Sequence, residues 1–396
     1  MDTESTTTKP ARHRDVELLI RGGGSDAGSE FYITARADPS GRLNGNGRDV
    51  FHAIARTLRA KRAWIAQERI FCSAEMMPAL LPARSEAYGN LDDRVPPTWL
   101  DAGPDKPFLG AQVYAVCLPI KPRPLTIQGR ICGRMMHHHG CRWITGSGLP
   151  VNRSGSRDLQ ARRAFEETQI LLKSAGTAIS SLARTWCYLD DILAWYPDFN
   201  SARSRFFAGV DPTNVDVQGS FPASTGIGVS PAGGDCCAVD FFAVAGCTVC
   251  PRSPRGCLCR HASAGRQRSA FEYGSSFSRA STVCTPSGRT VFVSGTAAID
   301  EDGTTRFPGD PAAQIRMTMD CIHAVLSDLH CPVRDVTQAV AYCKDAEVEA
   351  DFRRLSPRAD WPWIIVRGDI CRDDLLFEAE VTGLTSRSGA PTGAAL

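Results

Sequence analysis

Two glutamates, Glu378 and Glu380, stand one residue apart in an apolar segment near the end of the chain, LLFEAEVTG at 375–383. On a β-strand, residues i and i+2 face the same side, so the two carboxyl groups would project together. Two partly buried carboxylates side by side raise the pKa of at least one of them, and a carboxylic acid that is protonated near neutral pH is a useful general acid. A solvated strand face or a structural ion pair is the alternative, and the residues alone support both.

Two further segments carry side chains that could bind an anion. Residues 271–280, FEYGSSFSRA, place Tyr273, Ser276 and Arg279 near a glycine. An arginine can hold a carboxylate through two parallel hydrogen bonds. Residues 221–228, FPASTGIG, include Ser224 and could present backbone N–H groups to an anion. They do not form a phosphate loop, because no lysine follows and the glycine spacing differs. Each segment could instead be a plain turn.

Clustered cysteines and histidines could bind a metal in two places. Cys247, Cys250, Cys257 and Cys259 have the ligand type for zinc, but their spacing fits no common zinc finger. Residues 137–139 are adjacent histidines, and adjacent residues seldom converge on one ion. We therefore expect no metal site, and a zinc-stabilised interaction protein is the alternative.

An internal repeat indicates which elements must position these side chains. Residues 160–191 and 314–345 align without a gap at one offset (314 − 160 = 154), so that Gln160 recurs as Gln314 and Tyr188 as Tyr342. Each segment has apolar residues at helical spacing, then a short polar turn and a strand. A strand with a small glycine turn precedes each helix, and a second helix and a last strand pair follow.

The last strand of the repeat differs between the copies. Aligning 239–246 with 376–383 gives an offset of 137 (383 − 246 = 137), which makes Phe241 and Ala243 the equivalents of Glu378 and Glu380. We therefore expect the carboxylates in the last copy alone. A weaker first copy precedes these two, with strands expected at 31–34, 70–72 and 109–116 and a helix at 50–67.

Three similar units predict an α/β (α+β) fold, a pseudo-trimeric repeat of mixed sheets with the helices packed outside. Ligand sites are then expected in the clefts between units. The predicted parts are a disordered tail (1–14), a degenerate first unit (15–130), a central unit (131–246), a Cys/Arg-rich insertion loop (247–268), a third unit with the glutamates (269–385) and a second tail (386–396).

The composition argues against several classes of protein. The chain has 396 residues, 43% of them hydrophobic, and a formal net charge of +2. This near-neutrality argues against a nucleic acid or an anionic membrane as partner. No apolar run approaches the ~20 residues that span a bilayer, and the polar residues 1–14 do not read as a secretory signal. We expect a cytoplasmic monomer whose 16 scattered cysteines are reduced.

Several segments together resemble the chorismatases, enzymes that remove pyruvate from chorismate. The resemblance rests on residues 184–203, 221–228, 269–280, 291–303 and 369–380 and runs from about residue 130 to residue 383. The single unit resembles the RidA/YjgF fold, a trimer of such units, and a chorismatase is similar to that trimer fused into one chain. RidA proteins carry an arginine after the proline of the last strand pair. Here Pro222 and Pro362 are followed by alanine and tryptophan, which counts against plain imine deamination.

The resemblance implies a role for each candidate residue. Chorismate carries an enolpyruvyl ether and two carboxylates, and its cleavage begins with protonation of the terminal methylene carbon. The resemblance makes Glu378 the proton donor, with Glu380 orienting it or raising its pKa. It implies Arg279 for one substrate carboxylate and Arg142 or Arg203 for the other. The remaining expected pocket residues are Tyr273, Gly295, Thr296, Ser276 and Ser224. No metal or organic cofactor is implied, and the expected partner is the small-molecule substrate.

The product depends on the fate of the ring. Aromatising chorismatases resemble this chain in having a cysteine on the penultimate strand seven residues before the acid, here Cys371 (378 − 371 = 7). We therefore predict pyruvate plus 3-hydroxybenzoate, with 4-hydroxybenzoate as well in some members. Ala280 instead resembles the type that hydrolyses chorismate to 3,4-dihydroxycyclohexa-1,5-diene carboxylate. A RidA-like module that binds a small carboxylate without turnover is a further interpretation.

Overall fold

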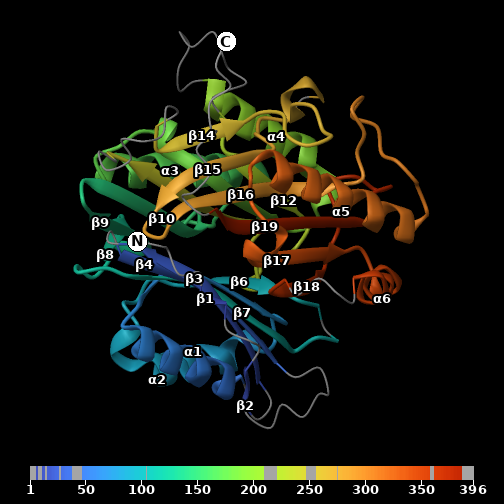
Figure 1. The fold of residues 1–396 in the computed structure, drawn as a ribbon. Coiled ribbons are helices and arrows are strands. Elements are labelled where there is room, and N and C mark those ends of the chain that lie inside the picture. Colours follow the sequence, from blue (N-terminus) through green and yellow to red (C-terminus); the bar gives the residue numbers. More distant parts are fainter. Residues whose placement is uncertain are drawn as a thin grey trace, which may run out of the picture.

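The described part of the chain consists of three β-sheets, each with two α-helices, arranged as Figure 1 shows. The computed structural model describes residues 6–7, 11–13, 16–25, 28–37, 47–103, 105–208, 221–246, 256–273, 275–356 and 361–385. The three sheets belong to three successive stretches of the sequence, which we call the first, central and third units.

The first unit has the strand order β1-β3-β4-β7-β5-β6, with β2 pairing with β3. Its strands are β1 (Thr6–Thr7), β2 (Ala11–His13), β3 (Val16–Ser25), β4 (Gly28–Ala37), β5 (Trp64–Cys72), β6 (Thr98–Asp101) and β7 (Phe108–Cys117). Its helices are α1 (Arg48–Lys61), α2 (Met77–Tyr88) and the 3-10 turn η1 (Gly89–Leu91).

The central unit has the order β8-β9-β10-β13-β11-β12 and the third unit β14-β15-β16-β19-β17-β18. The central elements are β8 (Arg123–Ile127), β9 (Arg130–His138), β10 (Cys141–Leu149), α3 (Arg157–Ser174), η2 (Ile179–Ser181), β11 (Leu182–Leu189), α4 (Ile192–Ala208), β12 (Ala223–Ile227) and β13 (Cys237–Ala245). The third-unit elements are β14 (Leu258–His261), η4 (Ala270–Tyr273), β15 (Ala280–Thr285), β16 (Gly288–Ala297), α5 (Pro311–Asp328), η5 (Val333–Asp335), β17 (Val336–Cys343), α6 (Ala346–Leu355), β18 (Trp363–Arg367) and β19 (Phe377–Thr385).

The three sheets share one topology, which confirms the pseudo-trimeric α/β repeat. In each unit the last strand of the chain segment, β7, β13 or β19, lies in the middle of the sheet between two antiparallel neighbours. In each unit one pair alone runs parallel, namely β5–β6, β11–β12 and β17–β18. A helix joins the two strands of each parallel pair, as a crossover connection requires.

Local sequence explains the repeated helix and strand. Helices α3 and α5 are each 18 residues long, and the side chains of Ser156 and Asp310 cap their first turns by accepting from the N–H groups of Leu159 and Ala313. The strands that follow, β11 and β17, are buried at every position. They are therefore rich in apolar residues on both faces rather than alternating.

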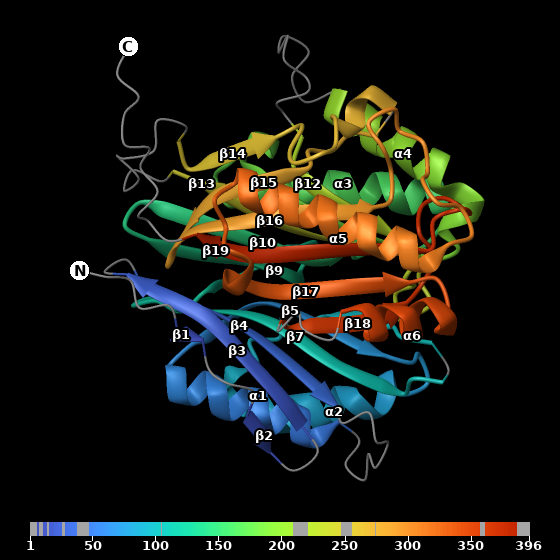
Figure 2. The same cartoon turned by 45° about the vertical axis from the view of Figure 1, so that its right-hand side comes forward.

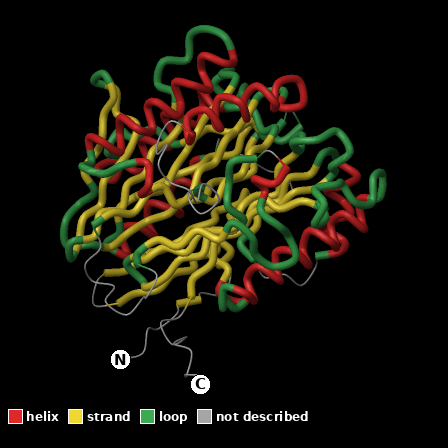
Figure 3. Tube along the Cα trace, turned by 90° about the horizontal axis from the view of Figure 1, so that it is seen from above, coloured by secondary structure: helices red, strands yellow, loops and turns green. Residues whose placement is uncertain are grey.

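The core of the described residues has a central cluster and three outer clusters, and the helices lie outside the sheets (Figures 2 and 3). Side chains from the inner faces of all three sheets, such as Tyr114, Trp186 and Tyr342, form the central cluster. Each outer cluster lies between one sheet and its own helices. The units are thus held together by burial of their inner faces, and polar groups at the centre must find partners in other units.

The predicted boundaries need three corrections. Strand β8 pairs with β9, so the central sheet begins near residue 123 and a boundary at 130 would divide a hairpin. Strand β14 pairs with β15, so part of the expected insertion loop extends the third sheet, while residues 247–255 lie outside the described residues. Strands β1 and β2 fall inside the tail predicted to be disordered, and 386–396 lies outside the described residues.

The first unit contains the strands expected at 31–34, 70–72 and 109–116, but the helix expected at 50–67 is too long. The chain leaves α1 at Arg62, whose φ of 50° is left-handed, and β5 begins at Trp64.

The strand register also corrects the equivalence between the last strands. Tyr188 pairs with Ala238 in the central unit, and its equivalent Tyr342 pairs with Glu378 in the third. The equivalent of Glu378 is therefore Ala238, at an offset of 140 (378 − 238 = 140) rather than 137. By the same register, Asp240 is the equivalent of Glu380. The third unit thus differs from the central unit by the carboxyl at position 378, whereas both units carry a carboxyl at the position of Glu380.

Two cysteines depart from the expectation of reduced thiols. Cys141 and Cys284 are disulfide-bonded, whereas the free cysteines of the described residues include Cys371 and Cys187. Within the described residues, no helix combines the length and the apolar character needed to cross a membrane.

Candidate active site

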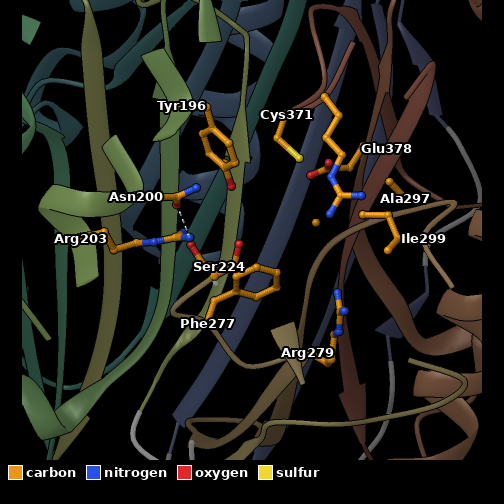
Figure 4. A pocket seen from close by; sticks show the side chains of 14 residues that line it. Tyr196, Asn200, Arg203, Ser224, Phe277, Arg279, Ala297, Ile299, Cys371 and Glu378 are labelled. Atoms are coloured by element: carbon orange, nitrogen blue, oxygen red, sulfur yellow. Dashed lines mark hydrogen bonds between the residues drawn. The ribbon is translucent and has the colours of Figure 1, made fainter. Parts of the chain in front are cut away.

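A cavity of about 210 Å³ lies between the central and third units (Figure 4). Its walls come from α4 and β12 of the central unit and from β16, β19 and their flanking segments of the third. The lining residues are Tyr196, Asn200, Arg203, Ser224, Gly226, Ser275, Phe277, Arg279, Gly295, Ala297, Ile299, Cys371, Arg372 and Glu378. In Figure 4, Tyr196, Asn200 and Arg203 lie on one side of the cavity and Glu378, Ala297 and Ile299 on the other.

Edge strand β12 faces the third unit, and serine hydroxyls hold the two together there. The Ser294 hydroxyl accepts from the N–H of Ser224 at 2.8 Å, and the Ser281 hydroxyl accepts from the N–H of Ala223 at 3.1 Å. Ser278 forms a parallel bridge with Ala223. Because these bonds satisfy an edge that would otherwise lack partners, they fix the width of the cleft.

Glu378 is the acidic group of the cavity and is only 5% exposed. Burial, and then the negative charge of Glu380, outweigh the guanidinium groups of Arg184 and Arg279 and raise the pKa of its carboxyl to about 8. At neutral pH this carboxyl is therefore protonated. A protonated carboxyl in a site shielded from water can donate its proton to a ligand.

Gly295 makes room for this carboxyl. The pairing of β16 with β19 shifts between Val293 and Thr296, and this irregularity brings the Gly295 backbone against the Glu378 side chain. A Cβ atom at position 295 would lie 2.0 Å from Oε1 of Glu378. Since real Cβ atoms do not approach a neighbour so closely, only glycine allows the observed position of the acid.

Glu380 does not line the cavity, although it is buried on the same strand. Its Oε1 accepts from Arg69 and from the indole of Trp186, each at 3.0 Å, and its Oε2 accepts from Arg184 at 2.6 Å and from the Thr225 hydroxyl. The alternative that the pair forms a structural ion pair therefore applies to Glu380, while Glu378 faces the cavity without an ion pair among the described residues.

Arg203 is a buried cation directed at the cavity from α4. It is 1% exposed, its Nη2 donates to Oδ1 of Asn200 at 2.6 Å, and its Nε is buried without a hydrogen bond. None of the ion pairs among the described residues includes it. A buried guanidinium without a carboxylate is energetically unfavourable, so this side chain favours an anionic ligand.

Phe277 separates Arg203 from a second buried arginine, Arg279. The centroid of its ring lies 5.7 Å from the Arg203 Cζ and 5.5 Å from the Arg279 Cζ. The Arg279 Nε donates to the carbonyl of Arg268 at 2.8 Å, which fixes the guanidinium. Two positioned guanidinium groups and one protonated acid suit a ligand with more than one carboxylate.

Cys371 and Tyr196 are neutral at physiological pH. Burial above all, and then the charge of Glu378, raise the pKa of the Cys371 thiol to about 12. Burial likewise raises the pKa of the Tyr196 phenol. A thiolate nucleophile at Cys371 is therefore disfavoured. The expectation that Cys371 lies on the penultimate strand is wrong, because β18 ends at Arg367 and Cys371 follows in the connection to β19.

The structure brings together six of the predicted site residues, namely Glu378, Cys371, Arg279, Arg203, Gly295 and Ser224. Arg142 is a correction, because its Nη1 donates to the carbonyl of Ala175 at the end of α3, away from the cavity. Thr296 is not among the lining residues, and its hydroxyl donates to the Ser294 carbonyl at 2.9 Å.

Ser276 lies near the cavity without lining it. The Ser276 hydroxyl hydrogen-bonds to the Ser204 hydroxyl at 2.8 Å and so ties the segment before β15 to α4. Tyr273 ends η4, and its side chain lies outside the described residues.

Sequence reasoning missed several lining residues. Tyr196 and Asn200 stand seven and three residues before Arg203, so the three share one face of α4, and this i, i+4, i+7 spacing could have identified them. Gly226 lies in the segment 221–228 that was considered as an anion-binding turn. Its role as a close neighbour of Tyr196, whose hydroxyl would lie 3.3 Å from a Cβ at position 226, is visible only in the structure. Phe277 and Arg372 lie in segments 269–280 and 369–380, which carried the resemblance, but neither was identified individually.

The other two units lack a carboxyl at the position equivalent to Glu378. The register of β7 places Gly110 at the position equivalent to Glu378, and Ala238 occupies it in the central unit. At the boundary of the third and first units, Glu349 of α6 instead forms ion pairs with Lys106 and Arg367. Among the described residues no group of three or more metal-binding side chains converges, and Cys247 and Cys250 lie outside them.

Comparisons with known proteins agree with this architecture. The sequence model of the family Endoribonuclease L-PSP matches residues 268–357. A solved structure of a chorismatase is similar with a TM-score of 0.54 at 21% identity, over 70% of this chain and 83% of that one. A YjgF/YER057c/UK114 family member from Mycobacterium tuberculosis is 20% identical over 32% of this chain and 99% of its own, with a TM-score of 0.26. The protein YJGH is 24% identical over 34% and 98%, with a TM-score of 0.27. A search of curated proteins gives no significant match. The chain thus has the fold of the chorismatase, as its sequence predicted.

Proposed function

We propose that this protein cleaves the enolpyruvyl ether of chorismate and releases pyruvate. The observation that carries the proposal is a buried carboxyl, Glu378, which is protonated at neutral pH and faces a cavity lined by the guanidinium groups of Arg203 and Arg279. The chorismatase fold supports the same reaction class.

The proposed reaction starts at the terminal methylene of the enol ether. Glu378 gives its proton to this carbon, and the double-bond electrons form the new C–H bond. The adjacent carbon becomes an oxocarbenium ion that the ether oxygen stabilises. In the hydrolytic branch, water adds to that carbon and loses a proton; the bond between that carbon and the ether oxygen then breaks, the ether oxygen takes up a proton and stays on the ring, and the products are pyruvate and the diene diol. In the aromatising branch, the ring hydroxyl of the substrate adds in place of water and loses its proton. One ring carbon–oxygen bond then breaks, so that this oxygen leaves as the ketone oxygen of pyruvate, while the other oxygen stays on the ring and is protonated. The ring loses a C–H proton as it becomes aromatic, and hydroxybenzoate forms with no net gain or loss of water.

The proposed roles of the other residues follow from their charges. Arg203 and Arg279 each bind one carboxylate of the substrate, and Phe277 keeps the two guanidinium groups apart. This binding holds the methylene carbon within reach of Glu378. Glu380 raises the pKa of Glu378 by its charge.

We propose 3-hydroxybenzoate as the aromatic product, with 4-hydroxybenzoate and the diene diol as alternatives. Cys371 lines the same cavity as Glu378, and burial keeps its thiol uncharged. This supports a role for Cys371 beside the ring rather than as a nucleophile.

The test is incubation of the purified protein with chorismate. Pyruvate is measured with lactate dehydrogenase, and the ring product is identified by chromatography against standards, since the two hydroxybenzoates have equal mass. Glu378→Gln is the matched control, because it keeps the shape of the side chain and removes the proton. Pyruvate release by a folded Glu378→Gln protein at the wild-type rate would refute the mechanism.

A binding module without turnover is a second candidate. The family model matches residues 268–357, which include Arg279 but stop before Glu378. Such a module would be stabilised thermally by chorismate without releasing pyruvate. We further propose a cytoplasmic monomer, because one chain supplies both walls of the cavity. Light scattering after size-exclusion chromatography tests the monomer.

A further inference from the structure

The first unit supplies none of the described residues that line the cavity, yet one of its side chains reaches the neighbour of the acid. Arg69 of β5 donates from Nη1 to Oε1 of Glu380 at 3.0 Å and to the hydroxyl of Tyr188 at 3.1 Å. Glu380 in turn stands two residues from Glu378 on β19. A contact that joins all three units thus ends beside the proposed proton donor.

Glu380 and the four residues that contact its carboxylate form what we call the Glu380 cluster, which consists of Glu380, Arg69, Arg184, Trp186 and Thr225. All five side chains are at least nine-tenths buried. The Trp186 ring has the guanidinium carbon of Arg69 4.9 Å from its centroid and that of Arg184 4.8 Å from it. This packing holds both cations in place by cation–π contact as well as by hydrogen bonds.

All four contacts to Glu380 come from donors. Arg69 and Trp186 donate to Oε1, and Arg184 and Thr225 donate to Oε2. A carboxylate accepts such bonds with both oxygens, whereas a carboxylic acid would have to donate one. The cluster therefore fits the ionised form of Glu380.

Two neighbouring carboxyl groups in a buried site compete for one proton, because both cannot be charged at low cost. The carboxyl with the cations keeps the negative charge and the other keeps the proton. We infer, on the basis of the proposed function, that Arg69 is a positioning residue which, acting through Glu380, keeps the transferable proton on Glu378.

Other ionisable groups surround the two carboxyl groups. Arg184, Arg279, Cys371 and Tyr196 interact with Glu378. Tyr188, Tyr342 and Asp240 interact with Glu380, in addition to Arg69 and Arg184. Among these cations, Arg69 interacts with the charge of Glu380 but is not one of the groups that change the pKa of Glu378 directly. Its substitution therefore tests the indirect effect.

The experiment compares Arg69→Gln with Arg69→Lys and with a matched control, Arg84→Gln. Arg84 is also a buried arginine of the first unit and pairs with Glu68 at 2.6 Å, but it is not part of the Glu380 cluster. We expect Arg69→Gln to lower kcat for pyruvate release with little change in KM. Measured near pH 9, above the pKa of Glu378, a loss of one pKa unit would lower the protonated fraction of Glu378, and with it kcat, about tenfold. Arg69→Lys keeps the charge and should recover most of the rate. Arg84→Gln should lower the melting temperature without this change in kcat.

A second readout does not depend on turnover. Infrared difference spectra report the protonated carboxyl band of Glu378, which Glu378→Gln removes. Arg69→Gln should weaken this band, and Arg69→Lys should restore it, even if chorismate is not the substrate. Arg69→Gln leaves Glu380 paired with Arg184, and Arg69→Met, which likewise removes the charge, covers the case in which Arg69→Gln does not fold. In the Glu380→Gln background, loss of Arg69 should not lower kcat or the band further.

An unchanged kcat and an unchanged band in folded Arg69→Gln would overturn the inference. An equal loss of kcat in Arg84→Gln would also overturn it, because the effect would then be one of stability. Absence of pyruvate release by the wild-type protein would instead refute the proposed function, and the infrared band would still decide the role of Arg69.

Discussion

The contact between Gly295 and Glu378 allows a quantitative prediction for Gly295→Ala. A Cβ at this position would stand 2.0 Å from Oε1, whereas real Cβ atoms essentially never come closer than 3.0 Å to such an atom. The carboxyl must therefore move by about 1 Å. A displacement of about 1 Å at a reacting group costs on the order of 100-fold in rate.

The assay is the steady-state rate of pyruvate release, with KM and the melting temperature measured alongside. We expect kcat to fall by about 100-fold, because the acid no longer reaches the methylene carbon. KM should change little, because the three atoms nearest to a Cβ at position 295 belong to Glu378 and Thr225 rather than to the guanidinium groups that bind the carboxylates. Gly226→Ala is the matched control, since a Cβ there would meet Tyr196 at 3.3 Å, which a small movement of the ring relieves. A folded Gly295→Ala protein with a kcat near that of the wild type would show that the acid does not act from its observed position.

Three further predictions concern the cavity. The pKa of Glu378 is raised to about 8, so the active protonated form is present at lower pH and kcat should fall as pH rises through about 8; a rate that instead increased through this range would contradict a general acid. The same raised pKa adds stability to the folded wild-type protein that is fully present below the usual carboxyl pKa and is lost as pH rises toward 8. Glu378→Gln has no such pH dependence, so its melting temperature minus that of the wild type should increase from pH 5 to pH 8. Calorimetry measures this difference, and a constant value would refute the prediction. Arg203→Gln should raise KM about tenfold without lowering the melting temperature of the ligand-free protein, because its guanidinium is buried without an ion pair; an unchanged KM would exclude it from substrate binding. Cys371→Ser should change the ratio of hydroxybenzoate to diene diol, as chromatography would measure, and a constant ratio would remove Cys371 from product control.

Periodicity in the sequence was sufficient to find the repeat. Helix and strand patterns are local, so residues 160–191 and 314–345 revealed two units, and their shared topology is confirmed. The weak first unit was also recognised, although its helix was extended past Arg62, where a left-handed turn ends α1. The sheet membership of β8 and β14 was missed, because short edge strands carry little apolar signal of their own.

The equivalence of the last strands shows where sequence alignment alone fails. Similar apolar letters aligned Phe241 with Glu378, but strand pairing makes Ala238 the equivalent residue. A shift by an odd number of residues exchanges the two faces of a strand. Register is set by hydrogen bonds to neighbouring strands, which a pattern of apolar residues in one strand does not record.

The sequence by itself determined the three units, the position of Glu378 on a strand, and Arg279 and Arg203 as candidate cations. Tertiary structure alone decided that Glu378 lies in a cavity while Glu380 is bound by Arg69 and Arg184 from the other two units. The reason is that alternation along a strand fixes the face on which a side chain lies. Which groups meet that face, and therefore which carboxyl is ionised and which keeps its proton, depends on residues that are distant in the sequence and are brought together by packing.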